Sequence, residues 1–213
     1  MIISEFIKRI ISSLILFPIL TYIVFYESLL FKLLLLILLI VSLIEWIKLI
    51  RNTLLILTGC IFITFSFFAV FQVAQIGSEF FYIILIICIS TDIGGYLFGK
   101  IIGGPKLTKI SPNKTFSGAI GSFLLPVFVF FILKNTQTIL TFELKLNIPL
   151  ILLLSLISQI GDLTVSYFKR LYNVKDTGKF IPGHGGLLDR IDGMLLVFPF
   201  IFLILQADKI NFS

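Results

Sequence analysis

The sequence predicts an all-α, polytopic integral membrane protein with about seven transmembrane helices and a cytoplasmic N-terminus. Hydrophobic residues make up 58% of its 213 residues, whereas soluble domains contain about 45–50%. Charged residues make up only 13%, and the mean hydropathy is +1.13. A water-soluble fold of this length could not bury so much apolar surface, so we expect the chain to lie in a bilayer. The net charge of +6 then indicates cations retained beside the membrane rather than nucleic-acid binding.

Seven apolar segments have lengths near the roughly 20 residues that a helix needs to cross a bilayer. The first is interpreted as a retained span rather than a signal peptide, because it lacks a small-x-small cleavage site and continues through Pro18 to Tyr26. The first two segments could instead form one helical hairpin joined near Ser28. The predicted spans are 10–26, 29–44, 54–71, 80–98, 116–133, 148–168 and 188–207.

The distribution of Lys and Arg predicts the orientation of these spans. With the N-terminus inside, 13 of the 17 Lys and Arg residues fall on the cytoplasmic side and 4 on the opposite side. Cytoplasmic loops of membrane proteins carry such an excess of basic residues. The C-terminus is therefore expected on the outside.

Four aspartates lie within or at the end of predicted spans, namely Asp92, Asp162, Asp189 and Asp192. An unpaired carboxylate at the centre of a membrane helix costs about 2.5–3.5 kcal/mol, so such residues usually face a polar interior and act there. All four fall toward the cytoplasmic ends of their spans. Asp189 and Asp192 are three residues apart, which places them on one face of a helix. Together the four predict a site for a hard cation such as Mg²⁺, although each could also be structural, through capping or a salt bridge.

Two predicted cytoplasmic loops, 99–118 and 169–187, hold most of the other polar residues. Topology alone explains lysines in the first loop, but Lys114 stands just before a helix start, where a lysine and backbone amides favour an anion. The second loop contains a PGHGG turn at 182–186, whose glycines permit positive φ and a close approach of N–H groups to a ligand. His184, the single histidine of the chain, is therefore either a loop hydrogen-bonding residue or a catalytic one.

Residues 166–192, SYFKRLYNVKDTGKFIPGHGGLLDRID, combine the basic residues, the glycine turn and the paired carboxylates. Here the chain resembles the phosphatidate cytidylyltransferase (CDP-diacylglycerol synthase) family, whose signature it satisfies throughout. Residues 91–118 and 158–163 are also similar to segments of that family, and Glu45-Trp46 resembles its acidic-Trp motif. The chain is shorter than a typical bacterial member, with the shortfall before the fourth predicted span. The matching signature positions are Ser166, Lys169, Arg170, Lys175, Asp176, Gly178, His184, Gly185, Gly186, Asp189, Arg190 and Asp192.

The resemblance implies transfer of CMP from CTP to phosphatidate, which yields CDP-diacylglycerol and pyrophosphate. The implied location is the cytoplasmic membrane of a bacterium, with the active site on the cytoplasmic face. Mg²⁺ is the implied cofactor, with a second, monovalent cation left open. The expected partners are CTP, phosphatidate in the bilayer, other membrane lipids and a second copy of the chain in a homodimer. We expect a single membrane domain, 1–213, with N-terminal spans at 1–75 and catalytic spans and cytoplasmic loops at 80–213.

The resemblance also assigns expected roles to individual residues. Cationic side chains would neutralise the nucleotide and lipid phosphates, and His184 with the glycine amides would position a phosphate. The expected metal ligands are Asp162, Asp189 and Asp192, and the other expected catalytic residues are Lys169, Arg170, His184 and Arg190. The expected substrate-binding residues are Asp92, Lys100, Lys114, Thr115, Lys175, Asp176, Gly185 and Gly186.

Two other functions fit parts of the pattern. A related CTP-dependent membrane lipid kinase or cytidylyltransferase would share the chemistry but use another lipid acceptor, and such relatives match the signature only partly. A small ion-coupled transporter would also use intramembrane acids. Transport predicts acids near the middle of the membrane with access from both sides, whereas these acids gather toward one side.

Overall fold

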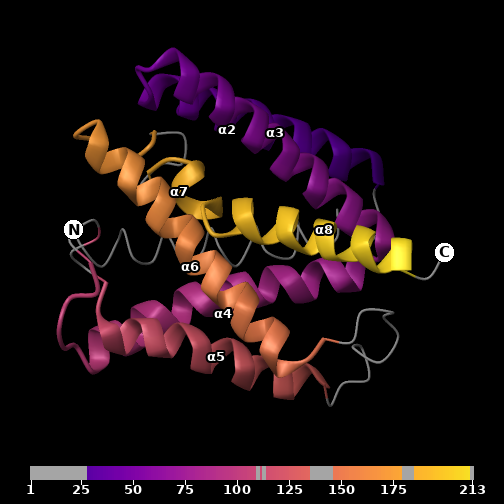
Figure 1. Cartoon of the computed structure of the whole chain (residues 1–213), viewed down its shortest axis with the longest axis vertical. Coiled ribbons are helices and arrows are strands. Elements are labelled where there is room, and N and C mark those ends of the chain that lie inside the picture. The colour runs from indigo at the N-terminus through magenta and orange to yellow at the C-terminus, as the bar shows by residue number, and fades with distance from the viewer. Residues whose placement is uncertain (1–27, 109–110, 112–113, 135–145, 179–184, 212–213) are drawn as a thin grey trace.

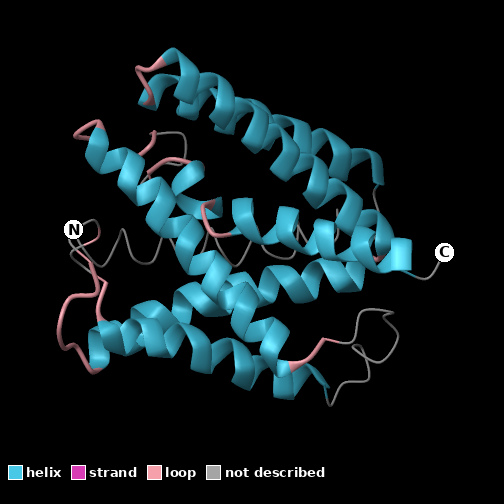
Figure 2. Cartoon of the chain, in the orientation of Figure 1, coloured by secondary structure: helices cyan, strands magenta, loops and turns pink. Residues whose placement is uncertain are grey.

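The computed structural model describes residues 28–108, 111, 114–134, 146–178 and 185–211. The first predicted span, 10–26, lies outside the described residues, and so does His184. In the part of the chain that is described, the regular elements are helices (Figure 2), and Lys106 and Thr115 form an isolated antiparallel bridge.

The described helices confirm the prediction of an all-α, polytopic membrane protein. Five of them, α2 to α6, are long and apolar enough to cross a membrane, and α8 is a shorter apolar helix. The helices are α2 (Ser28–Leu49), α3 (Thr53–Ile76), α4 (Ser78–Ile101), α5 (Phe116–Lys134), α6 (Ile148–Leu171), α7 (Leu188–Ile191) and α8 (Met194–Asn211).

The helices pack as two hairpins joined by a central layer (Figure 1). The α2–α3 hairpin and the α4–α5 hairpin lie on opposite sides, α8 lies between them, and α6 runs diagonally past α7 and across α4 in this view. The α2–α3, α4–α5 and α6–α7 connections all lie at the same end of the molecule, at the left of Figure 1. This arrangement gathers the polar loops of the chain at one end of the helix bundle.

Small residues let α4 and α5 approach closely. A Cβ atom added at Gly94 would lie 2.2 Å from the carbonyl oxygen of Gly121, so the two backbones are in direct contact. Buried hydroxyl groups continue this packing toward α6, because Thr91 donates to Ser155 at 3.2 Å and Ser155 donates to the carbonyl of Ser122. Small and hydroxyl residues at helix interfaces are typical of membrane bundles, where apolar burial does not distinguish protein from lipid.

A tryptophan fixes the α2–α3 hairpin. The indole N–H of Trp46 donates to the carbonyl of Leu55 at 3.2 Å, and the ring packs edge-on against Phe168 of α6 with centroids 5.0 Å apart. A Cβ atom at Gly59 would lie 2.0 Å from the indole nitrogen, so a glycine is required beside the ring. At the start of α3, Asn52 accepts a hydrogen bond from the N–H of Leu55 at 3.2 Å and caps the helix.

The predicted span 188–207 is not one continuous helix. The chain forms the short helix α7, turns at Asp192 and Gly193, and begins α8 at Met194. The carboxylate of Asp192 accepts a hydrogen bond from the N–H of Gly193 at 2.8 Å. A Cβ atom at Gly193 would lie 2.3 Å from the hydroxyl oxygen of Ser158, so the turn presses against α6. Hydropathy alone cannot detect this break, because the apolar character resumes directly after it.

Candidate active site

Lys114 and Asp162 join the first polar loop to α6. The Nζ atom of Lys114 lies 2.5 Å from Oδ2 of Asp162, and both side chains are partly exposed, at 25% and 29%. The other oxygen, Oδ1 of Asp162, accepts a hydrogen bond from the hydroxyl of Ser166 at 3.3 Å. The loop holds Lys114 in place through a hydrogen bond from the N–H of Leu107 to the carbonyl of Lys114 at 2.8 Å.

Two further aspartates lie within electrostatic range of this ion pair. Asp92 of α4 and Asp192, at the turn before α8, repel the carboxylate of Asp162 and each other, while Lys114 attracts Asp92. Asp192 is buried, with 7% of its surface exposed. Three like charges drawn from separate elements are unfavourable in a low-dielectric region unless a cation balances them. A cation bound beside these carboxylates would relieve their repulsion.

Asp189 points to a different set of partners and organises the second polar loop. Its Oδ1 accepts from Nζ of Lys169 at 2.7 Å, and its Oδ2 accepts from the N–H of Thr177 at 2.8 Å, the hydroxyl of Thr177 at 3.1 Å and the N–H of Gly186 at 3.1 Å. Burial by itself would raise the pKa of Asp189. The hydrogen bonds from Lys169, Thr177 and Gly186 outweigh burial and lower the pKa below its usual value. The carboxylate of Asp189 is thus ionised at neutral pH and holds Lys169, Thr177 and Gly186 together.

Glu45 is a buried carboxylate that the sequence analysis noted only as part of a family motif, without a role. Only 5% of its surface is exposed. Its Oε1 accepts from the N–H of Leu187 at 2.9 Å, and its Oε2 accepts from the N–H of Leu188 at 2.9 Å and the hydroxyl of Thr177 at 3.0 Å. The rule that drew attention to the aspartates, a carboxylate within an apolar span, would have identified Glu45 as well.

The glycines of the second loop allow these two carboxylates to approach the backbone. Gly185 has a φ of +87°, which is strained for residues with a Cβ atom. A Cβ atom at Gly186 would lie 2.0 Å from the hydroxyl oxygen of Thr177, and one at Gly178 would lie 2.5 Å from Oε1 of Glu45. The N–H of Gly186, expected to bind substrate, donates to Asp189 in this structure.

The remaining predicted site residues occupy the rims of the two loops. Lys100 lies over the ring of Tyr96 at the end of α4, 5.5 Å from the ring centroid. Thr115 accepts a hydrogen bond from the N–H of Gly118 at 3.1 Å and so stabilises the start of α5. Arg170 donates to the carbonyl of Val174 at 3.3 Å. Lys175 and Asp176 of the second loop and Arg190 of α7 are also exposed.

The described residues do not form a closed metal cage. Among them, no three His, Cys, Asp or Glu side chains come close enough to hold a metal ion by themselves. Proteins usually bind Mg²⁺ through one or two carboxylates, with substrate phosphates and water as the other ligands, so a Mg²⁺ site does not require three such side chains. Binding of Mg²⁺ by Asp162, Asp189 and Asp192 stays a prediction, and of these three Asp162 and Asp192 repel each other electrostatically.

The fold and the site define a polytopic membrane protein that gathers carboxylates and lysines from several helices and loops at one end of its bundle. The chain belongs to the cytidylyltransferase family, because the model of that family matches residues 51–208.

Named relatives agree with this assignment. The chain is similar to a phosphatidate cytidylyltransferase of Rickettsia bellii, with 34% identity over 210 residues that cover 94% of this chain and 91% of the relative. It is similar to the phosphatidate cytidylyltransferase of Staphylococcus epidermidis, with 35% identity over 76% of this chain and 72% of the relative. A phosphatidate cytidylyltransferase of Bacillus subtilis is 40% identical over 62% of this chain and 49% of the relative.

Proposed function

We propose that this chain transfers CMP from CTP to phosphatidate and releases CDP-diacylglycerol and pyrophosphate. The observation that carries the proposal is the Lys114–Asp162 ion pair beside Asp92 and Asp192, in a chain that belongs to the cytidylyltransferase family. The similarity to phosphatidate cytidylyltransferases over nearly the full chain supports phosphatidate as the lipid acceptor.

The chemistry requires charge neutralisation more than acid–base catalysis. An oxygen of the phosphatidate phosphate forms a bond to the α-phosphorus of CTP, the bond between that phosphorus and the bridging α–β oxygen breaks, and pyrophosphate leaves with the electron pair. A phosphate monoester has a second pKa near 6, so the nucleophile is largely ionised at neutral pH and needs no strong base. The obstacle is the approach of two polyanions, which positioned cations relieve.

Lys114 and Lys169 are the lysines placed to do this. Lys114 reaches the site on a loop and is 25% exposed, so it can turn from Asp162 toward a nucleotide phosphate. Lys169 is fixed by Asp189 and has 12% of its side chain exposed, so it presents its charge from a defined position. Arg170, Lys175 and Arg190 lie on the exposed rim, where they would attract the anionic substrates.

Asp162 and Asp192 would hold Mg²⁺, with Asp92 as a supporting carboxylate. When bound there, Mg²⁺ would neutralise oxygens of the triphosphate and of the leaving pyrophosphate. Asp189 was also expected to be a ligand, and that role stays a prediction. Its four hydrogen bonds to Lys169, Thr177 and Gly186 favour a positioning role instead. A monovalent cation beside Mg²⁺ stays a prediction too.

We place the site on the cytoplasmic face of a bacterial membrane, with the N-terminus inside. The support is the excess of Lys and Arg on that side of the predicted spans and the gathering of the polar loops at one end of the described bundle. CTP is supplied from the cytoplasm, which agrees with this placement. A homodimer stays a prediction.

The test is conversion of labelled CTP by the purified protein in mixed micelles that contain phosphatidate, with Mg²⁺ or with a chelator. We expect a labelled liponucleotide and pyrophosphate in equal amounts with Mg²⁺, and neither with the chelator. Product formation with a polyprenol but not with phosphatidate would support a CTP-dependent reaction and show that its lipid acceptor is not phosphatidate. Absence of CTP consumption with every acceptor, while the protein carries ions across vesicles, would favour the transporter.

A further inference from the structure

Two of the described helices contain an internal proline that leaves a backbone carbonyl without its helical donor. Proline has no N–H, so the carbonyl four residues before it loses the hydrogen bond that continues the helix. Pro126 lies inside α5 and Pro199 lies inside α8. The carbonyls concerned are those of Ser122 and Leu195. In a bilayer such a carbonyl needs a donor from the protein, because water does not reach it.

Each of these two carbonyls accepts a hydrogen bond from a buried serine on another helix. Ser66 of α3 donates to the carbonyl of Leu195 at 2.8 Å, and Ser155 of α6 donates to the carbonyl of Ser122. Both serines are fully buried. The same combination of an internal proline and a serine from a neighbouring helix therefore occurs at two separate interfaces of the bundle.

The hydroxyl of Ser66 has a second acceptor within reach, because it lies 2.9 Å from the carbonyl of Phe62 on its own helix. That carbonyl lies inside α3, where the N–H of Ser66 is its regular helical donor. The carbonyl of Leu195 has no such donor, since residue 199 is proline. The single hydroxyl hydrogen therefore stabilises the structure most when it is donated to Leu195.

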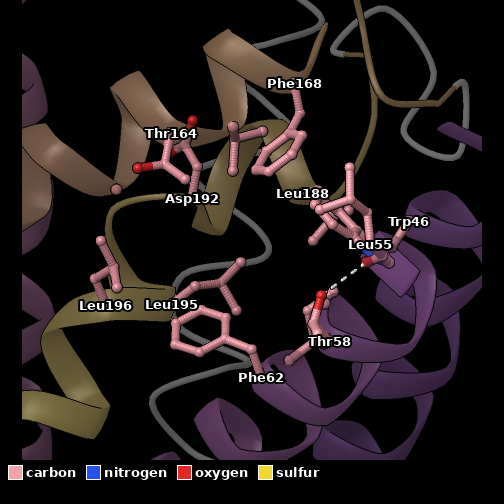
Figure 3. Close-up of a pocket in the computed structure, with 14 residues that line it drawn as sticks. Trp46, Leu55, Thr58, Phe62, Thr164, Phe168, Leu188, Asp192, Leu195 and Leu196 are labelled. Carbon is pink, nitrogen blue, oxygen red and sulfur yellow. Dashed lines mark hydrogen bonds between the residues drawn. The ribbon is translucent and has the colours of Figure 1, made fainter. Parts of the chain in front are cut away.

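The two bonds fix the elements that carry Asp192 and Asp162. Leu195 is the third residue after Asp192 and belongs to the first turn of α8. Figure 3 shows the start of α8 between α3 and α6, with Leu195 on the side of α3 and Asp192 near Thr164 of α6. On α6, Ser155 lies seven residues before Asp162. Seven residues are about two turns, so these two side chains lie on the same face of the helix.

We propose that Ser66 and Ser155 are positioning residues, which bind the carbonyls freed by the prolines and thereby set where Asp192 and Asp162 stand relative to each other. The role of these two carboxylates in catalysis rests on the proposed function. Because the carboxylates repel each other, their spacing has to be imposed by the helices that carry them. A working site requires its groups to be held within about 0.5 Å of the productive geometry.

The first experiment is a double-mutant cycle between Ser66→Ala and Pro199→Ala. Pro199→Ala returns an N–H to α8, which can bond the carbonyl of Leu195 and makes the hydroxyl of Ser66 dispensable. In the wild type, we expect Ser66→Ala to raise the Mg²⁺ concentration for half-maximal activity about tenfold, as a buried acceptor left without a donor displaces the turn. In the Pro199→Ala background, the same substitution should change this midpoint by less than about twofold. A loss of folded protein alone would lower the maximal rate and the Tm without moving the midpoint.

Ser42→Ala is the matched control for Ser66→Ala. Ser42 is equally buried, and its hydroxyl donates to the carbonyl of Leu38 on its own helix at 2.7 Å. That carbonyl keeps its regular donor, the N–H of residue 42, so the substitution should leave the Mg²⁺ midpoint unchanged. Ser155→Ala with Pro126→Ala forms a second, independent cycle, in which we expect the same dependence on the proline.

The second experiment does not depend on turnover. Hydrogen exchange followed by mass spectrometry reports the opening of the peptide 190–198, in which the N–H of Gly193 donates to Asp192. Exchange in this peptide should become about tenfold faster in Ser66→Ala than in the wild type. In the Pro199→Ala background, adding Ser66→Ala should change the exchange rate by less than about twofold.

Equal effects of Ser66→Ala in both backgrounds would overturn the proposal. Faster exchange and a lower Tm with an unmoved Mg²⁺ midpoint would also overturn it, since a bond that serves only stability gives that result. Exchange that depends on the proline, in a protein that forms no product from CTP and phosphatidate, would support the positioning of the turn and remove the proposed reaction. Product formation with equal effects of Ser66→Ala in both backgrounds would keep the reaction and remove the positioning role.

Discussion

Glu45 of α2 and Asp189 of α7 meet at one hydroxyl group. The Oγ1 atom of Thr177 lies 3.0 Å from Oε2 of Glu45 and 3.1 Å from Oδ2 of Asp189. The single hydroxyl hydrogen can be donated to only one of them at a time. Both carboxylates also accept backbone N–H groups of the segment 177–188. The second polar loop is thus held from two sides, by Glu45 of the distant helix α2 and by Asp189 of α7.

Glu45→Ala should reduce both stability and activity. The substitution leaves the N–H groups of Leu187 and Leu188 without their acceptor in a buried region, at a cost of about 1–3 kcal/mol for each unsatisfied group. We expect a lower Tm in detergent and a turnover reduced by more than about tenfold. Glu45→Gln, which keeps one carbonyl oxygen, should lose less.

Glu79→Gln is the control for Glu45, because Glu79 is an exposed carboxylate in the first turn of α4. It should behave as the wild type. A Glu45→Ala protein with wild-type Tm and turnover would remove Glu45 from the support of the loop.

Asp189→Asn should abolish turnover, by about 100-fold or more, while membrane insertion stays intact. The amide cannot hold Lys169 through charge and also accept the N–H groups of Thr177 and Gly186. If Asp189 acts by positioning Lys169, then Lys169→Gln, Asp189→Asn and the double variant should show similar losses, because the second substitution removes nothing further. Additive losses would instead indicate that Asp189 has a separate task, such as ligating Mg²⁺.

Lys114→Ala should weaken the use of CTP. A hydrogen bond to a charged group contributes about 1.5–3 kcal/mol, which corresponds to a fall in kcat/KM for CTP of about 10- to 100-fold. Initial rates at varied CTP concentration measure this. Lys106→Ala is the control, because Lys106 is exposed on the same loop and the substitution removes an equal charge. Equal effects of the two substitutions would mean that Lys114 acts only as one of the basic loop residues that orient the chain in the membrane.

Asp162→Asn should raise the Mg²⁺ concentration required for half-maximal activity by at least about 10- to 100-fold, the loss typical of substituting residues that only support metal ligands. Loss of one carboxylate ligand weakens the metal but leaves the fold, since Asp162 is partly exposed. Titration with Mg²⁺ at saturating CTP gives the midpoint. A midpoint that does not move, with reduced turnover, would place Asp162 outside the metal site.

The sequence was sufficient to predict the spanning helices α2 to α6, but it missed the break in the predicted span 188–207, and the predicted span 10–26 lies outside the described residues. Apolar length predicts a span directly, and an intramembrane aspartate such as Asp162 is costly enough to indicate function. The sequence predicted that Lys114 would favour an anion at a helix start and bind substrate. The structure pairs it with the carboxylate of Asp162, and its binding of substrate stays a prediction.

The internal contacts of the site could not be predicted in the same way. Asp189 and Asp192 are three residues apart, yet the turn at Gly193 and the partners of Asp189 give the two carboxylates different neighbours. The bonds of Glu45 to Leu187 and Leu188 cross more than 140 positions of sequence. Neither the periodicity nor the hydropathy of the sequence indicates from which buried backbone N–H a distant carboxylate will accept a hydrogen bond.

The position of Glu45 bears on how this chain can be divided. The family match begins at residue 51, just beyond α2, so a fragment cut at that boundary would keep every residue of the signature and lose the acceptor for Leu187 and Leu188. The smallest autonomous unit that can support the second polar loop therefore includes α2. Any chimera that exchanges the N-terminal helices for those of a relative must bring a carboxylate to the place of Glu45, or the transplanted loop will have no anchor.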